Sequence, residues 1–378
     1  IRNGILKPGM SVSIMSGDKK VSQGKINEVF GFKGLERVVI TEAQAGDIAI
    51  ITGLEDIGIG LTIADTEQPA GLPIIPVDEP TLTMDFMVNS SPLAGKEGKF
   101  VTSRQIRDRL TKELLVNVAL RVEDTSDADV FRVSGRGELH LTILLENMRR
   151  EGFEIAVGKP RVVYREVDGK RHEPYENLTV DIDDDNQGAV MEELGRRKGE
   201  LTNMESDGLG RTRLEYLIPA RGLIGFQGEF LTMTRGTGVM SHIFENYALA
   251  KSEMPGRRNG VLISSEKGES VAYALWKLQE RGKMLVSPGE KLYEGMVIGI
   301  HSRDNDLIVN PIKGKQLTNV RSSGTDEAVR LVPAILMTLE YAVEFIDDDE
   351  LVEITPKSLR IRKRYLIEHE RKRAAKTD

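Results

Sequence analysis

The sequence predicts a multidomain α+β protein: a partial β-barrel, two ferredoxin-like α/β sandwiches, and a C-terminal domain of mixed barrel strands and helices. Its 378 residues exceed what one hydrophobic core organises, which indicates two to four domains. A hydrophobic content of 39% and a charged content of 29% are typical of a globular protein in water. The hydrophobic pattern also changes along the chain, from short alternating runs to a repeated strand–helix order.

Residues 1–77 carry short alternating runs, "VSIM", "KINEVF", "RVVI" and "DIAIIT", separated by Gly and Asp. Several short strands at close spacing predict a small, partial β-barrel. The opening "IRNGILKPGM" has a strand–turn–strand pattern with no beginning, so we expect a fragment of a longer protein. Four prolines in residues 67–80 interrupt strand pairing and predict a linker.

Residues 78–168 show the order strand, helix, strand, strand, helix, strand, which is typical of a ferredoxin-like sandwich. Ser103 can cap the first helix, and Ile106, Leu110 and Leu114 fall four apart on one face. The second helix, in "GELHLTILLENMRREG", has a glutamate in its first turn, arginines in its last turn and a terminal glycine.

Residues 169–250 repeat that order, with a hairpin turning at Asp207-Gly208. We expect a second helix in "RGLIGFQGEFLTMTRG". Arg136 and Arg221 occupy equivalent places, at the entrance of the second helix of each sandwich. This internal repeat predicts two tandem ferredoxin-like domains.

Residues 251–378 mix helices, "ESVAYALWKLQERG" and "LEYAVEFI", with strands, "GVLIS", "MVIGIH" and "AILMT". The closing "SLRIRKR" alternates. A period of two places Arg360, Arg362 and Arg364 together on one face of a strand. We therefore expect a fourth domain over 251–378 with a basic edge.

Catalytic and metal-binding signatures are missing from the sequence. The absence of cysteine excludes thiolate catalysis and disulfides, and the five histidines lack metal-ligand spacing. The sequence contains no Walker loop. It also contains no apolar run of about 18 residues, so no membrane span is predicted. We expect no catalytic residue, no metal site and no cofactor in this chain, and a cytoplasmic location.

Two patterns resemble ligand sites. Asp181, Asp183, Asp185 and Glu192 have the spacing of a calcium loop, but Asn186 stands at the position that needs glycine. An acidic strand end before a helix N-terminus explains them better. The glycines of "RGLIGFQGEF" match neither nucleotide-binding spacing, and close helix packing explains these glycines better.

The strongest anion candidate is the loop "IKGKQLTNVRSSGTDEA", residues 312–328, in a chain of net charge -7. It is too polar to fill a core, and its cations and amide or hydroxyl donors suit phosphate oxygens. The charge balance is +6 from Lys357 to Asp378 and -13 before it, which favours a polyanion approached from one end. An ordinary surface loop is the alternative. The predicted RNA contacts are Lys313, Lys315, Gln316, Asn319, Arg321, Ser322, Ser323 and Thr325.

Secondary RNA contacts are predicted at Arg360, Arg362 and Arg364, and candidate anion or interdomain contacts at Arg136 and Arg221. An arginine at a helix entrance of a ferredoxin-like domain can hold a phosphate. A phosphate-handling enzyme using Arg136 or Arg221 is therefore the alternative function, with structural ion pairing as the commoner role of such arginines.

Several stretches carry a family resemblance over essentially all 378 residues. "IRNGILKPGM" and "AGDIAIITGLEDIGIG" resemble the barrel domain of translational GTPases, and "SGRGELHLTILLENMRREGFEIAVGKPRVVYR" resembles their third domain. "PARGLIGFQGEFLTMTRGTG" and "GTDEAVRLVPAILMTLEYAVEFIDDDELVEITPKSLRIRKR" are similar to the BipA (TypA) family of ribosome-associated GTPases. Gly60-Leu61-Thr62 departs from the Gly-Asp-Thr of many relatives, within the barrel.

The resemblance implies a bacterial, monomeric ribosome partner whose GTP-binding domain, with GTP and Mg, lies outside this chain. It implies that the C-terminal domain enters the ribosomal A-site region, where the loop 312–328 approaches rRNA and the tRNA acceptor end. It further implies roles in ribosome assembly and in stress or low-temperature translation, and no membrane partner. A LepA-type elongation factor is the nearer alternative, which the ending "EFIDDDELVEITPKSLRIRKR" disfavours.

Overall fold

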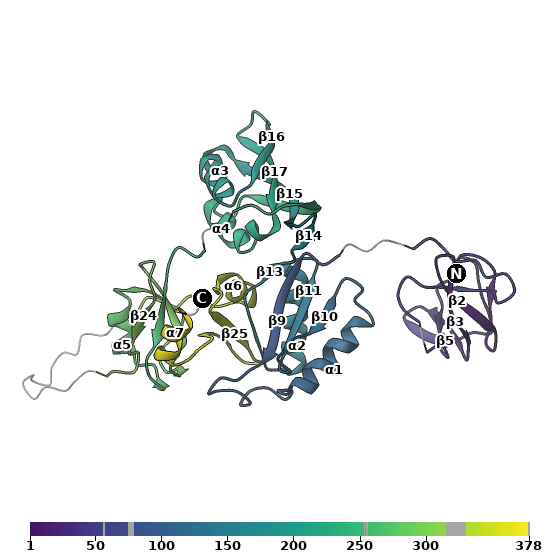
Figure 1. The fold of residues 1–378 in the computed structure, drawn as a ribbon, viewed down its shortest axis with the longest axis horizontal. Helices are drawn as coiled ribbons and strands as arrows, with labels where there is room; N and C mark the ends of the chain where they lie inside the picture. Colours follow the sequence, from purple (N-terminus) through teal and green to yellow (C-terminus); the bar gives the residue numbers. More distant parts are fainter. Residues whose placement is uncertain (56, 75–78, 253, 255, 315–329, 377–378) are drawn as a thin grey trace, which may run out of the picture. The chain divides into compact units, whose positions relative to one another are not determined.

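The computed structural model describes residues 1–55, 57–74, 79–252, 254, 256–314 and 330–376. The chain divides into two compact units (Figure 1). The first comprises residues 1–78 with 112–118, and the second comprises residues 79–111 with 119–378. None of the helices in the described ranges is long and apolar enough to cross a membrane.

The first unit is built from short antiparallel strands. They form three small sheets, with orders β1-β6, β3-β2-β8 and β5-β4-β7. Val12, Ile26, Val29 and Ala43 fill its interior. The strands are β1 (Ile5–Leu6), β2 (Ser11–Ser16), β3 (Lys19–Lys25), β4 (Val29–Lys33), β5 (Glu36–Val39), β6 (Ala43–Gln44), β7 (Ile50–Ile51) and β8 (Thr62–Ala64).

The second unit begins with the predicted element order, and its strands lie side by side in the order β10-β11-β9-β12. Helix α2 packs against β11. Its ends confirm the prediction: Glu138 lies in the first turn, and Gly152 ends the helix with a φ of 101°. The elements are β9 (Leu82–Val88), α1 (Ser103–Leu114), β10 (Arg121–Asp124), β11 (Val130–Gly135), α2 (Glu138–Glu151) and β12 (Ile155–Val157).

The next segment has the equivalent strand order, β16-β17-β15-β18. A core of its own includes Leu178, Val190, Leu214 and Phe226. The elements are β13 (Arg161–Val162), which pairs with β9, then β14 (Arg165–Val167), β15 (Lys170–Asp183), α3 (Gln187–Arg196), β16 (Glu200–Ser206), β17 (Arg211–Pro219), α4 (Phe226–Met233) and β18 (Val239–Leu249).

Helix α4 is shorter than predicted. A 3₁₀ turn occupies Ala220–Gly222, and α4 begins only at Phe226, because Gly225 adopts a left-handed φ of 70°. At Gly222 a Cβ atom would lie 2.7 Å from the carbonyl oxygen of Arg197. Gly225 therefore allows a tight turn, and Gly222 allows a close backbone approach. Of the three glycines in "RGLIGFQGEF", only Gly228 lies in helix α4.

The C-terminal part mixes short strands and helices. The predicted strand "AILMT" is wrong: residues 334–338 contain no strand, although the Ile335 N–H donates to the Met284 carbonyl at 2.9 Å. The elements are β19 (Val261–Ser264), β20 (Gly268–Glu269), α5 (Ala272–Leu278), β21 (Gly282–Met284), β22 (Lys291–Leu292), β23 (Met296–His301), β24 (Leu307–Val309), α6 (Leu339–Phe345), β25 (Glu350–Ile354), β26 (Leu359–Lys363) and α7 (Glu368–Ala374).

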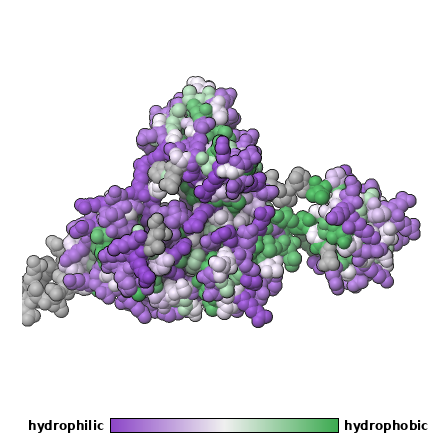
Figure 2. Space-filling model, viewed as in Figure 1, coloured by the Kyte–Doolittle hydropathy of each residue, from purple (hydrophilic) through white to green (hydrophobic). Residues whose placement is uncertain are grey.

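One sheet runs through two of the predicted domains. Strand β12 pairs antiparallel with β25, with Ile155 opposite Ile354 and Val157 opposite Val352. The strand path continues as β10-β11-β9-β12-β25-β26-β23-β19-β24. A shared hydrophobic core joins these parts, with α6 packed on α2. Over the second unit, the face seen in Figure 2 is mostly hydrophilic. The predicted domains, 78–168 and 251–378, stay a prediction, but this sheet contains strands from both of them.

Candidate nucleic-acid interface

The predicted anion-binding loop follows β24. Lys313, one of its predicted contacts, is described and exposed. The other predicted contacts in the loop lie outside the described residues: Lys315, Gln316, Asn319, Arg321, Ser322, Ser323 and Thr325. The described residues on either side of the loop show how its two ends are held.

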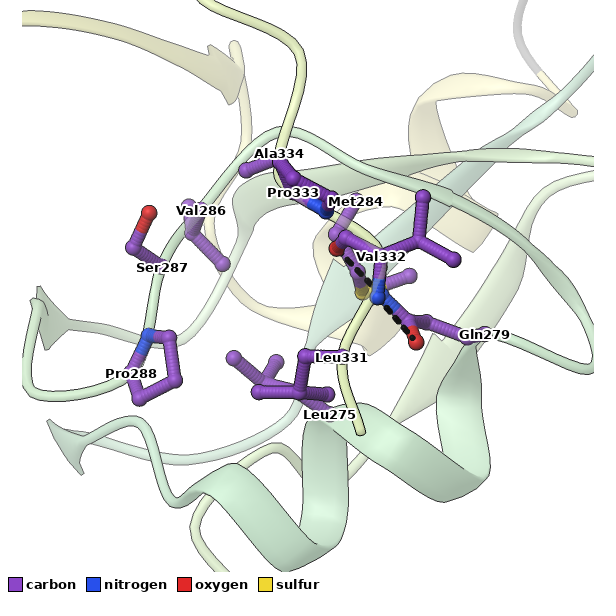
Figure 3. Close-up of a pocket in the computed structure, with 10 residues that line it drawn as sticks. All are labelled: Leu275, Gln279, Met284, Val286, Ser287, Pro288, Leu331, Val332, Pro333 and Ala334. Carbon is purple, nitrogen blue, oxygen red and sulfur yellow. Dashed lines mark hydrogen bonds between the residues drawn. The ribbon is translucent and has the colours of Figure 1, made fainter. Parts of the chain in front are cut away.

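Both ends of the loop are hydrogen-bonded to helix α5. On the outgoing side, the Pro311 carbonyl accepts a 3.0 Å hydrogen bond from the N–H of Val271, the N-cap residue of α5. On the returning side, the Gln279 side chain, at the C-cap, donates to the Val332 carbonyl at 2.7 Å. It also accepts from the Val332 N–H at 3.2 Å (Figure 3). Helix α5 thus fixes the loop's base.

An apolar depression supports the returning segment (Figure 3). Leu331 and Pro333 face side chains from α5 and from the strand that follows it, including Leu275 and Met284. Val332 is 71% exposed, so its backbone is held while its side chain faces solvent. The sequence pattern did not identify Val271 and Gln279 as anchors of the loop. Gln279 lies at the exit of a predicted helix, where a side-chain amide can reach a neighbouring backbone.

The arginine face predicted on the closing strand is largely paired with carboxylates. Arg360 Nη2 lies 2.6 Å from Glu97, and Arg362 Nε lies 3.3 Å from Glu353, a contact without hydrogen-bond geometry. Arg362 also donates to Ser90 Oγ at 3.2 Å and is 3% exposed. Arg364, in contrast, is exposed. The RNA role of Arg360 and Arg362 stays a prediction, and their geometry is that of structural ion pairs.

Glu353 lies opposite Arg360 on the neighbouring strand β25 and is fully buried. The Tyr293 hydroxyl donates to it. Burial raises the pKa of Glu353, although Tyr293 and the two arginines act in the opposite direction. Burial and the neighbouring carboxylate also raise the pKa of Tyr293. The sequence could not reveal this network, because Glu97, Tyr293 and Glu353 are far apart in the chain.

Arg221 is held by a buried carboxylate. Its guanidinium pairs with Glu173, which is 0% exposed, and donates to the carbonyls of Lys251 at 2.8 Å and Ser252 at 2.9 Å. Arg136 is exposed, and its carbonyl accepts from Thr81 Oγ1. Arg221 therefore ties strand β15 to the segment after β18, which matches an interdomain contact better than a phosphate site.

The acidic stretch at the end of β15 is paired with basic and hydroxyl groups. Arg213 Nε lies 2.9 Å from Asp181, and Thr237 Oγ1 donates to Asp183 at 2.7 Å. Within the described ranges, no three His, Cys, Asp or Glu side chains are grouped to hold a metal. Asp181 and Asp183 instead contact side chains of β17 and of the segment before β18, and among the described residues the turn before α3 has no side-chain cap.

Three family models match successive parts of the chain. Residues 1–64 match "Elongation factor Tu domain 2", residues 170–258 match "Elongation factor G C-terminus", and residues 259–368 match "TypA/BipA C-terminal domain". A crystal structure of a Thermus thermophilus protein gives a TM-score of 0.39 at 16% identity, covering 65% of this chain and 52% of that one. That likeness is too weak to support a conclusion about the fold.

Curated relatives match along nearly the whole chain. Proteins named "Large ribosomal subunit assembly factor BipA" are 59% identical over 99% of this chain in Escherichia coli K12 and 56% identical over 100% in Haemophilus influenzae. The one from Buchnera aphidicola is 52% identical over 99%. The chain spans 61–62% of the length of these relatives. Its identity to them, with the C-terminal domain match, shows that the chain belongs to the TypA/BipA family.

Proposed function

We propose that this chain is the ribosome-binding part of a translational GTPase that acts in assembly of the large ribosomal subunit. The observation that carries the proposal is the 59% identity over 99% of the chain to a relative named for that role. The anchored base of the polar loop adds support, because both flanks of a cationic stretch are hydrogen-bonded at the ends of helix α5. The relatives described above are all named BipA, and this naming disfavours the alternative of a LepA-type factor.

In this proposal the chain binds the ribosome and positions the GTPase domain. That domain lies outside this chain and hydrolyses GTP with Mg. The two segments with strand orders β10-β11-β9-β12 and β16-β17-β15-β18 are ferredoxin-like sandwiches that follow the barrel along the chain. The protein works as a monomer in the cytoplasm. Its loop, residues 312–328, reaches rRNA and a tRNA end in the A-site region.

The alternative of a phosphate-handling enzyme receives no support from the geometry. Arg221 pairs with buried Glu173 and two backbone carbonyls. A guanidinium satisfied in this way has little capacity left for a phosphate.

The test removes the charges of the loop. Lys313, Lys315 and Arg321 are replaced together by alanine, and co-sedimentation of the chain with 70S ribosomes and isolated large subunits is measured across a salt series. We expect weaker binding and a shallower dependence of log K on log salt, by roughly 0.7–0.9 per lost phosphate contact.

A matched control replaces Lys19, Lys20 and Lys33 by alanine. These lysines are exposed and lie in the first unit. The control therefore removes the same amount of charge at positions distant in sequence from the loop. We expect a smaller change in the salt slope than in the loop variant. Identical salt slopes for the loop variant and the unaltered chain would show that the loop does not bind RNA.

A further inference from the structure

Helix α5 carries two aromatic rings and a cation on one face. The ring centroids of Tyr273 and Trp276 are 6.2 Å apart, and the planes are inclined by 32°. Lys277 Nζ lies 4.6 Å from the centroid of the Tyr273 ring, in a cation–π contact. The three residues stand at spacings of three and four, which places them together on the helix surface. We call Tyr273, Trp276 and Lys277 the α5 face.

The α5 face is not needed for the hydrophobic core. Ala274 and Leu275, on the other side of the helix, are buried and pack inward. Trp276 is 44% exposed and Lys277 is exposed. An indole that remains this accessible beside a lysine leaves a flat apolar surface next to a positive charge. Core packing therefore does not account for the α5 face.

The position of α5 connects this face with the predicted RNA loop. The helix is hydrogen-bonded to Pro311 at its start and to Val332 at its end, so it lies between the two ends of the loop. Lys313 and Arg330, at those ends, are both exposed. A strand of RNA held by the loop would therefore have a cationic and aromatic surface at the loop's base.

We propose that the α5 face is a stacking platform for an unpaired base of RNA. This inference rests on the proposed function and adds the kind of RNA that the surface recognises. Aromatic rings stack on any exposed base, and the neighbouring cation attracts the adjacent phosphate. A duplex hides its base faces, so the platform selects single-stranded or flipped-out nucleotides. Trp276 provides the stacking surface, while Lys277 lies over the half-buried Tyr273 ring and adds charge.

The first experiment uses the single tryptophan of the chain, which is Trp276. The emission of the intact 378-residue chain is titrated with a single-stranded 12-nucleotide RNA and, separately, with the same RNA annealed to its complement. Stacking on the indole would quench the emission saturably with the single strand, and by less than half as much with the duplex. Equal quenching by both forms, or none by either, would overturn the platform.

The second experiment measures affinity by the fluorescence anisotropy of the labelled single strand. Trp276→Ala should weaken binding about 5- to 150-fold, with little change in the salt slope. Lys277→Ala should reduce the slope by about 0.7. Phe32→Ala, which removes another exposed aromatic ring, is the matched control and should leave binding unchanged. Circular dichroism checks that each variant is folded.

Ribosome co-sedimentation separates this inference from the proposed function. If Trp276→Ala leaves RNA binding intact while the loop variant loses ribosome binding, the proposed function stands and the platform is wrong. If Trp276→Ala loses ribosome binding but the oligonucleotide neither binds nor quenches, the face docks a protein and the platform is again wrong. Loss of both RNA and ribosome binding in Trp276→Ala supports the platform.

Discussion

Lys363 and Glu350 form an ion pair inside the second unit, with Nζ 3.0 Å from the carboxylate and exposed side-chain fractions of 2% and 0%. Asp306 and Asp349 also lie within 2.8 Å of the same ammonium group. Burial opposes the positive charge, but the three carboxylates raise the pKa of Lys363. Arg257 completes the group with two hydrogen bonds to Glu350, at 2.8 and 2.9 Å.

Lys363→Met should destabilise the chain. Removing one partner of a buried ion pair leaves carboxylates without compensation, which costs about 3–5 kcal/mol in the free energy of unfolding. The exposed pair of Lys372 and Glu368, at 2.6 Å, is the matched control, and Lys372→Met should cost far less, because solvent screens that pair. Chemical denaturation monitored by circular dichroism measures both. Equal losses in the two variants would contradict the structural role of Lys363.

Arg221→Met should likewise lower the free energy of unfolding, by about 3–5 kcal/mol, because it leaves the buried Glu173 carboxylate without its cation. The Lys251 N–H still donates to that carboxylate at 2.8 Å, so the loss should fall at the lower end of this range. Arg213→Met, which breaks the more exposed pair with Asp181, is the control and should cost much less, because solvent screens that pair. A change in thermal unfolding no larger than the control's would argue against the interdomain role of Arg221.

The local features of the fold could be predicted from the sequence. The ends of α2 follow from residues within one turn: Glu138 at the start, Arg149 and Arg150 near the end, and Gly152 after it. The repeated strand–helix order could also be predicted, because alternation and helical periodicity are properties of short windows. The candidate loop could be predicted only in part. Its polar composition is visible in the sequence, but the residues that anchor its two ends are not.

The remaining features depend on contacts between distant residues. The period of two in β26 identifies the face that carries Arg360 and Arg362, but not that Glu97 and Glu353 lie against it. Likewise, the pattern of β12 predicts a buried strand and cannot show that β25 is its neighbour. Strand alternation specifies which side chains share a face, whereas pairing partners are chosen by the tertiary fold.

Gln279→Leu should loosen the returning end of the loop. The substitution keeps the side chain's bulk but removes both hydrogen bonds to Val332. Each such bond contributes about 0.5–1.5 kcal/mol, so amide hydrogen exchange at Val332 should accelerate about 10-fold. Glu280→Leu, at the exposed neighbouring position, is the control and should leave this exchange rate unchanged. Unchanged exchange in Gln279→Leu would show that the apolar packing alone holds the segment.

Glu138 should make the stability of the second unit depend on pH. Its side chain is enclosed at the start of α2, and one carboxylate oxygen has no hydrogen-bond partner among the described residues. Burial, together with the nearby Glu344 carboxylate, raises the pKa of Glu138 to about 8, although the Gly225 N–H opposes the shift. Burial also raises the pKa of Glu344. Gly225 precedes α4 and Glu344 lies in α6, so the proton sits where three segments meet.

The sign of the effect follows from proton binding. In the folded chain Glu138 keeps its proton up to about pH 8, whereas in the unfolded chain it releases the proton near its ordinary value of 4.5. The folded state therefore binds more protons between these values, and raising the pH through this window lowers the free energy of unfolding. At about 1.4 kcal/mol per pKa unit, the loss is on the order of 3–5 kcal/mol by pH 8. Glu138→Gln, which keeps the shape without ionising, should remove most of it.

Urea denaturation of the chain and of Glu138→Gln, from pH 5 to pH 8.5, measures the difference. Glu123→Gln, at an exposed position in the same unit, is the matched control and should retain the pH dependence of the unaltered chain. Because deprotonation places two carboxylates at the meeting point of α2, α4 and α6, the lost stability should appear first as faster amide exchange in α4. A free energy of unfolding that falls equally with pH in both variants would show that Glu138 ionises without cost to the fold.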